Sequence, residues 1–196
     1  METIIIDCST AELTDEQFLY ICRQNEALRF EMTAQGDLIV MPPVGGTSGN
    51  RESDLNADVQ IWNRRSRLGK VFSSSTVFRL PNGAKRSPDV AWVEQSRWEA
   101  LSKEDQEKFP PIAPDFVIEL RSRTDRLASL QAKMQEYLDN GVRLGWLINP
   151  QDQQVEVYAL EAVTVTLPLP TQLSGAAVLP GFVLDLNPFL AKFCTF

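Results

Sequence analysis

The segment 115–146 constrains the fold more than any other part of the chain. It consists of an apolar strand, DFVIEL, an amphipathic stretch, DRLASLQAKMQEYLDNG, and a second apolar strand, RLGWLI. Apolar side chains recur at helical spacing in the middle stretch, and Asn140-Gly141 is a strong helix stop signal. Because such a unit joins two parallel strands through a right-handed crossover, we expect a parallel strand pair covered by this helix.

The remaining elements predict antiparallel neighbours for this pair. Thr14 begins a capping box and a short helix that ends at about Asn25. LRFEMTA and DLIVMPP flank a Gln-Gly pair and predict a hairpin, and a second helix is expected at about 50–68, ended by Gly69. VFSSSTVFRL predicts one strand or two short ones, and PFLAKF a final short helix. The order predicts an α/β (mixed α+β) fold whose long helices pack on a central mixed sheet.

The length of the chain and the lack of internal boundaries predict one domain over residues 1–196. No repeat, low-complexity tract or linker interrupts the 196 residues, and no apolar run is long enough to span a bilayer. The N-terminus lacks the features of a signal peptide, and the cysteines are odd in number and follow no metal spacing: Cys8, Cys22 and Cys194. We therefore expect free thiols, a reducing cytoplasmic setting and no membrane partner.

The chain contains no histidine, which limits the chemistry that it can perform. A Ser-His-Asp triad, a Cys-His pair and histidine-based metal sites are excluded. Any catalysis has to use the remaining polar side chains, and carboxylates suit a hard divalent cation.

Charge is distributed unevenly along the sequence. The net charge is −7, yet residues 61–86 hold seven basic residues and no acidic one. This basic stripe is compatible with a surface that faces a polyanion, and equally with a solvated helix end and loop. Its members are Arg64, Arg65, Arg67, Lys70, Arg79, Lys85 and Arg86.

Two acidic residues stand where apolar strands begin or end. Strand alternation places Glu119 on one face of DFVIEL, near its end, and Asp89 directly precedes the strand VAWV. A carboxylate among apolar neighbours is costly unless it is paired, hydrogen-bonded or bound to a metal. If the two strands are adjacent, Asp89 and Glu119 converge, and a divalent cation between them removes their repulsion.

Each acidic residue also has a structural interpretation. Asp115 follows Pro114 and is expected to begin a strand, and Asp89 follows Pro88 as in many turns. Glu119 can form a buried ion pair with one of three nearby arginines, Arg121, Arg123 or Arg126.

Two further residues carry no local signal of function. Lys133 has the pattern of an ordinary lysine on a helix surface. Glu31 alternates with apolar Phe30 and Met32, which is compatible with a side chain that faces solvent.

Several sequence motifs, taken in their order along the chain, resemble the motifs of one protein family. They are LRFEMTAQGDLIVMPP, SPDVAWV, PDFVIELRS, LQAKMQEYLDNGVRLGWLINP, QVEVY and LSGAAVLPGFVLDL. Together they are similar to the Uma-type endonuclease family, within the restriction-endonuclease-like PD-(D/E)XK superfamily. The similarity covers about residues 14–190.

The resemblance implies a central mixed sheet flanked by helices and Mg²⁺-dependent (or Mn²⁺-dependent) hydrolysis of DNA. Asp89 matches the aspartate of the motif and Glu119 its second acid, both as metal ligands, while Glu31 matches an acidic position that adds to the metal site. Arg121 stands where the superfamily has lysine. Lys133, on the following helix, matches the lysine that replaces it, with Arg121 as a second candidate.

The resemblance also has consequences for one loop, for the DNA-binding surface and for the oligomeric state. RSRTD departs from the family pattern at Arg123, where proline is expected, so this loop is expected to be more mobile. The basic stripe and the arginines beside Glu119 would hold the DNA backbone, and duplex cleavage by two sites predicts a homodimer.

Two other functions compete with this one. The first is a catalytically silent module that binds nucleic acid or a partner with the same fold, favoured by Arg121 and by the acidic net charge. The second is a metal-dependent hydrolase of RNA or another phosphodiester. Metal-independent, salt-sensitive DNA binding would support the first, and substrates compared side by side would identify the second.

Overall fold

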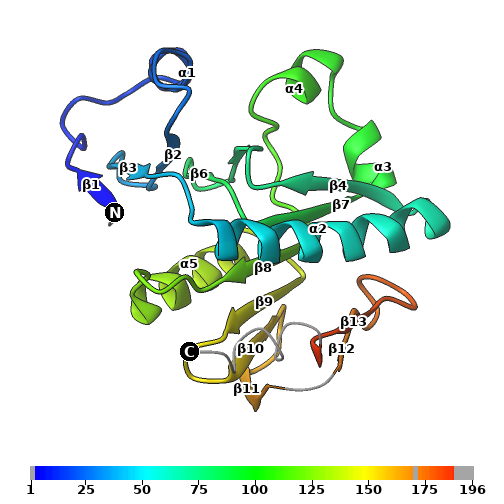
Figure 1. Ribbon diagram of the computed structural model, residues 1–196. Helices are drawn as coiled ribbons and strands as arrows, with labels where there is room; N and C mark the ends of the chain where they lie inside the picture. The colour runs from blue at the N-terminus through cyan, green and yellow to red at the C-terminus, as the bar shows by residue number, and fades with distance from the viewer. Residues whose placement is uncertain (1–2, 170–171, 188–196) are drawn as a thin grey trace.

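The computed structural model describes residues 3–169 and 172–187 (Figure 1). In chain order the elements are β1 (Ile4–Ile6), α1 (Asp15–Gln24), β2 (Arg29–Met32), β3 (Leu38–Met41), α2 (Gly46–Ser66), β4 (Gly69–Ser73), β5 (Phe78–Arg79), β6 (Lys85–Arg86), β7 (Val90–Glu94), α3 (Gln95–Glu99), α4 (Lys103–Glu107), β8 (Phe116–Leu120), α5 (Leu127–Asp139), β9 (Leu144–Asn149), β10 (Gln154–Ala159), β11 (Val165–Pro168), β12 (Gln172–Ser174) and β13 (Val183–Asp185).

A six-stranded mixed sheet forms the centre of the molecule, in the order β11-β10-β9-β8-β7-β4. Strands β8 and β9 are parallel and are joined through α5, whereas the other neighbouring pairs are antiparallel. The predicted parallel pair and the mixed α+β class are therefore confirmed.

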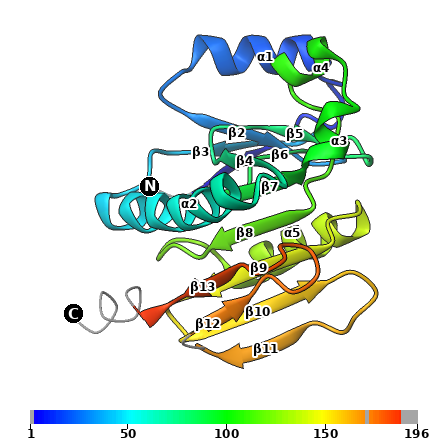
Figure 2. The ribbon, with the colours of Figure 1, turned by 90° about the vertical axis from the view of Figure 1, so that its right-hand side faces the viewer.

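Helices cover both faces of this sheet (Figure 2). Val90 and Trp92 of β7 point to the side of α2, into a core that includes Leu55 and Val59. The alternate residues of the strand point to the side of α5, into a second core that includes Met134. Strand alternation thus sends odd-numbered residues of β7 and β8 toward α5.

A five-stranded sheet, β1-β3-β2-β6-β5, lies beside the central one. The predicted capping box at Thr14 and the hairpin β2–β3 are both present. VFSSSTVFRL divides into β4, in the central sheet, and β5, in the five-stranded sheet. The chain then returns through β6 to β7, so the residues between these strands, which include Asp89, lie where the two sheets meet.

Gly69 has a different role from the predicted one. Helix α2 ends at Ser66, before the predicted end at about residue 68. Its C-cap is Arg67, whose φ of 56 lies in the left-handed region. Gly69 instead begins β4, where an added Cβ would lie 2.2 Å from the carbonyl oxygen of Val93 and 2.6 Å from the ring of Trp92. The close approach of β4 to β7 therefore requires glycine.

Gly69→Ala is expected to lower the free energy of unfolding by roughly 3 kcal/mol, because backbone and a buried indole have to move to admit the methyl group. Chemical denaturation measures the change. Gly49→Ala in α2 is the matched control: its Cβ would meet only Val44 at 3.6 Å, so this variant should be neutral or slightly more stable. Equal stability of the two variants would contradict the steric explanation.

The final short helix expected around PFLAKF falls outside the described residues. None of the helices in the described ranges is long and apolar enough to cross a membrane.

Candidate active site

The register between β7 and β8 brings Asp89 and Glu119 together. Val90 lies opposite Ile118, so the next position along each strand places Asp89 beside Glu119. The Asp89 carboxylate accepts a hydrogen bond of 2.8 Å from the backbone N–H of Leu120. The convergence expected from adjacent strands is therefore present, at the junction of the two sheets.

Glu119 is buried and is held by two side chains of α5. Its Oε1 lies 2.9 Å from the ammonium of Lys133 and accepts a hydrogen bond of 2.9 Å from the hydroxyl of Tyr137. Lys133 and Tyr137 are four residues apart and so project from the same side of the helix. An ion pair of Glu119 with one of the nearby arginines is not found among the described residues.

Glu31 does not face solvent: the residue is only 2% exposed. Its Oε1 lies 2.8 Å from the ammonium of Lys133 and accepts the backbone N–H of Ser87 at 2.8 Å, while its Oε2 lies 3.1 Å from the guanidinium of Arg86. Glu31 comes from β2 and Lys133 from α5, so this ion pair links the five-stranded sheet to the helix on the central sheet.

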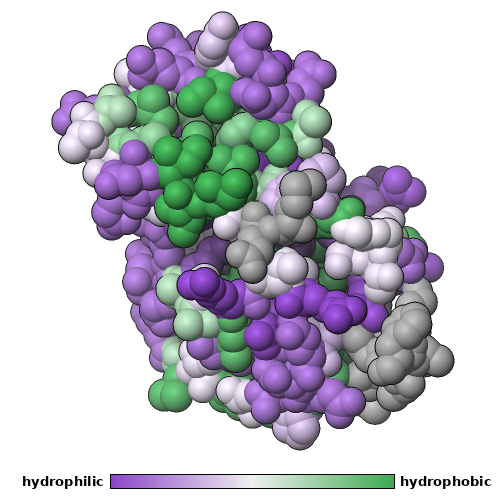
Figure 3. Space-filling model, turned by 60° about the vertical axis from the view of Figure 1, so that its left-hand side comes forward, coloured by the Kyte–Doolittle hydropathy of each residue, from purple (hydrophilic) through white to green (hydrophobic). Residues whose placement is uncertain are grey.

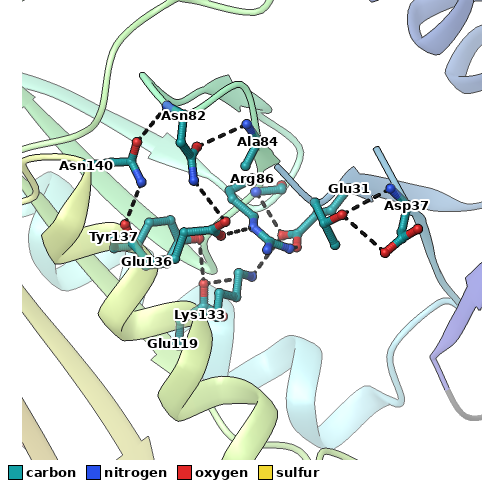
Figure 4. Close-up of polar contacts among 12 residues, drawn as sticks. Glu31, Asp37, Asn82, Ala84, Arg86, Glu119, Lys133, Glu136, Tyr137 and Asn140 are labelled. Atoms are coloured by element: carbon teal, nitrogen blue, oxygen red, sulfur yellow. Dashed lines mark hydrogen bonds and ion pairs between the residues drawn. The ribbon is translucent and has the colours of Figure 1, made fainter. Parts of the chain in front are cut away.

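Lys133 is the centre of this arrangement (Figure 4). Its ammonium lies between the carboxylates of Glu31 and Glu119, and its side chain is 13% exposed. Lys133 is therefore not an ordinary helix-surface lysine.

Arg121 lies away from the other predicted site residues. Its guanidinium contacts Asp152 at 2.8 Å, the side-chain oxygen of Asn149 at 3.2 Å and the carbonyl of Asp125 at 3.3 Å. These partners tie it to the β9–β10 turn and to its own loop. The two candidate cations are thus in different places, and only Lys133 contacts Glu119.

Asp115 has the structural role that the sequence predicts. It is fully buried, accepts the backbone N–H of Glu94 at 2.8 Å and forms ion pairs with Arg97 and Arg143. Its position at the start of β8, at the opposite end of the strand from Glu119, keeps it outside the site.

The basic stripe is not one surface. Lys85 and Arg79 are paired with Asp15, and Lys85 is 2% exposed. Arg86 is paired with Glu31 and Glu136 inside the protein (Figure 4). The part of the basic stripe that remains available to a polyanion lies at the end of α2. A hollow of about 380 Å³ there is lined by Asn63, Arg64, Arg67, Gly69, Lys70 and Gln95.

Sequence reasoning missed three residues that contribute to the site. Tyr137 lies in the amphipathic stretch DRLASLQAKMQEYLDNG and had no functional signal of its own, and Arg86 was considered only as a member of the basic stripe. Glu52 of α2 carried no signal at all, yet its charge acts on Asp89, and it accepts a hydrogen bond from Ser74. A spacing of four residues from Lys133 was the only available signal for Tyr137.

Burial and mutual repulsion control the ionisation of the acids. Burial raises the pKa of Asp89 to about 8, and the charges of Glu119 and Glu52 act in the same direction. Burial likewise raises the pKa of Glu119, with Lys133 opposing it. Glu31 differs: burial acts to raise its pKa, but Lys133 and Arg86 outweigh burial and hold the pKa below its ordinary value.

Asp89 should make the metal-free protein less stable as the pH rises. The folded state keeps the Asp89 proton up to about pH 8, whereas the unfolded chain loses it near 3.8. Between these values the folded state binds more protons, so stability falls with rising pH by up to about 1.4 kcal/mol per unit. Asp89→Asn should remove this part of the slope in EDTA, as measured by denaturation from pH 5 to 9. If the stability of wild type and of Asp89→Asn changed with pH in the same way, the raised pKa of Asp89 would be contradicted.

The neighbouring carboxyl groups are of the ligand type that hard divalent cations prefer. Glu31 and Glu119 form ion pairs with Lys133, and Glu31 and Glu136 form ion pairs with Arg86. The charges of Glu119 and Glu52 act on Asp89. Within the described ranges no three acidic, histidine or cysteine residues form a metal cluster by themselves. Mg²⁺ commonly uses only one or two carboxylates and keeps its waters, so a pair such as Asp89 and Glu119 would be enough to hold it.

Known proteins share this architecture and sequence pattern. A crystal structure described as a putative nuclease belonging to DUF820, from Anabaena variabilis ATCC 29413, is similar at a TM-score of 0.76 and 20% identity, over 92% of this chain and 99% of that one. This similarity confirms the restriction-endonuclease-like fold. No curated protein matches the chain. Residues 15–187 match the Uma2 family, described as "Putative restriction endonuclease", and the chain belongs to that family.

Proposed function

We propose that this protein is an Mg²⁺-dependent endonuclease that hydrolyses phosphodiester bonds of DNA. The observation that carries the proposal is the convergence of Asp89 and Glu119 across β7 and β8, with the ammonium of Lys133 2.9 Å from Glu119. Family membership supports the nuclease class, and the acids supply the oxygen ligands that Mg²⁺ or Mn²⁺ prefers.

Asp89 and Glu119 would hold the metal, with the carbonyl of Leu120 as a further candidate ligand. A bound Mg²⁺ would supply Lewis-acid charge at the phosphate and lower the pKa of a bound water. Asp89 has to lose its proton to serve as a ligand, so metal affinity should increase with pH up to about 8.

Lys133 would act through its charge. Burial acts to lower its pKa, but Glu119 and Glu31 raise the pKa above the ordinary lysine value, so the ammonium stays protonated. A protonated ammonium cannot accept a proton from water, but it can orient a water molecule and stabilise charge that develops on the phosphate. Glu31, whose oxygens are occupied by Lys133, Arg86 and Ser87, would position this ammonium.

The nucleic-acid backbone would contact cations outside this cluster. Arg64, Arg67 and Lys70 line the hollow at the end of α2 and form no ion pair with any residue in the described ranges. Backbone contacts of this kind give affinity without sequence specificity.

Incubation of the wild-type protein with supercoiled plasmid, with Mg²⁺ or with EDTA, tests the proposal. We expect nicked and linear products with Mg²⁺ or Mn²⁺ and none with EDTA. A structured RNA in parallel reactions distinguishes a general phosphodiesterase, which would cleave both. Cleavage in EDTA would reject the metal-dependent mechanism. Salt-sensitive DNA binding without cleavage under any condition would identify a silent binding module instead.

A further inference from the structure

Strand β1 has an open edge. It occupies the end of the five-stranded sheet and pairs with β3 on one side, and no strand in the described ranges pairs with its other side. An edge of this kind presents unpaired backbone N–H and C=O groups, which soluble proteins usually protect with charges, proline or a covering segment.

The β1 edge carries three isoleucines instead. Ile4, Ile5 and Ile6 are 60%, 66% and 45% exposed, in spite of their size and hydrophobicity. Figure 3, in which the side that carries β1 comes forward, shows hydrophobic surface gathered over the upper half of this face. A contiguous exposed apolar area on an edge strand indicates an interaction surface.

We propose that this edge binds the same edge of a second copy of the chain, so that β1 pairs antiparallel with its counterpart around a two-fold axis at Ile5. In this register Ile5 lies opposite Ile5 of the second copy, and Ile4 lies opposite Ile6. Thr3 then lies opposite Asp7, so no two like charges face each other. The edge is thus complementary to itself, as an isologous interface requires.

The hydrophobic core continues across this interface. The pairing of β1 with β3 and of β3 with β2 places Ile4 and Ile6 on the same face as Phe30 and Met32. That face holds the small core that α1 covers through Phe18. In the dimer Ile4 and Ile6 of both copies meet on this face and join the two small cores. This continuity favours a second copy over an unrelated strand.

The dimer would also set the relation between two active sites, a consequence that rests on the proposed nuclease function. Glu31 lies opposite Ile39, which lies opposite Ile5. In the joined sheet the two Glu31 residues are five strands apart, about 24 Å at a spacing of about 4.8 Å. Because the two-fold axis is perpendicular to the sheet, both point to the same face. Two sites at this distance fit within one turn of a duplex, about 34–36 Å.

Sedimentation at tens of micromolar protein tests the interface without any substrate. We expect a wild-type dimer that Ile5→Lys weakens at least about tenfold, because two lysines would face each other across the axis. Val163→Lys, at an 86% exposed position outside β1, is the matched control and should remain dimeric. A monomeric wild type, or an Ile5→Lys variant that dimerises normally, would overturn the proposal.

Cross-linking tests the register and does not depend on how well Ile5→Lys folds. In a background with Cys8, Cys22 and Cys194 replaced by serine, Ile5→Cys should form an intermolecular disulfide under mild oxidation, since opposite residues of antiparallel strands meet disulfide geometry. Val163→Cys should not. Absence of the Ile5 cross-link would reject this register. A dimer that fails to cleave plasmid would reject the nuclease proposal alone, and a monomer that cleaves would reject only the interface.

Discussion

Lys133→Met is expected to lower the free energy of unfolding at pH 7 by about 3–5 kcal/mol and to abolish cleavage. The ammonium lies 2.8 Å from Glu31 and 2.9 Å from Glu119, both buried, and its removal leaves their charges without this partner. Protonation of Glu31 and Glu119 would remove the unpaired charges. The difference in free energy of unfolding between wild type and Lys133→Met should therefore become smaller as the pH falls toward 5. Urea denaturation at pH 5 and pH 7 measures both effects.

Lys108→Met provides the control for this prediction. Lys108 is an exposed lysine that pairs with Glu104 one helical turn away, so its loss should leave the stability almost unchanged at either pH. A Lys133→Met protein as stable as this control would show that the two carboxylates do not depend on the ammonium.

Glu119→Gln and Asp89→Asn are expected to reduce Mg²⁺-dependent plasmid cleavage by on the order of 10³-fold each, and to weaken Mg²⁺ binding measured by calorimetry. Both changes keep the shape of the side chain and remove the charge that would hold the metal. Because metal and proton compete for Asp89, wild-type binding at pH 8 should exceed that at pH 6.

Asp152→Asn is the matched control for these two variants. Asp152 is an acid in the β9–β10 turn that pairs with Arg121 rather than with Lys133, so cleavage should stay within about twofold of wild type. Cleavage that survives in both Glu119→Gln and Asp89→Asn would exclude the proposed ligands. Loss of cleavage in Asp152→Asn would indicate that its partner Arg121 contributes to the reaction.

The fold was largely predictable because its signals are local. The capping box at Thr14, the alternation in DFVIEL and the Asn140-Gly141 stop each depend on a few neighbouring residues, and each predicted element is present. Gly69 was misinterpreted because its neighbours in sequence suggest a helix end, whereas its role depends on Val93, which belongs to another strand.

The site was predictable only in part. Asp89 and Glu119 could be selected because a carboxylate next to an apolar strand is costly, but their distance depended on the register of β7 and β8. Lys133 came only from the resemblance to a family, since a lysine on a helix has no local mark of burial. The catalytic roles of all three remain predictions for the variants above.

The sequence by itself determined most of the helices and strands, the parallel β8–β9 pair and the acids available for a metal, because alternation and helical spacing act over a few residues. It did not predict β1 or the five-stranded sheet. Only the tertiary structure decided which charges neutralise each other. It placed Arg86 inside the protein with Glu31, turned Arg121 toward Asp152 and gave Lys133 to Glu31 and Glu119. Ion pairs act through space between segments up to 102 residues apart, and their strength depends on burial that no stretch of sequence records.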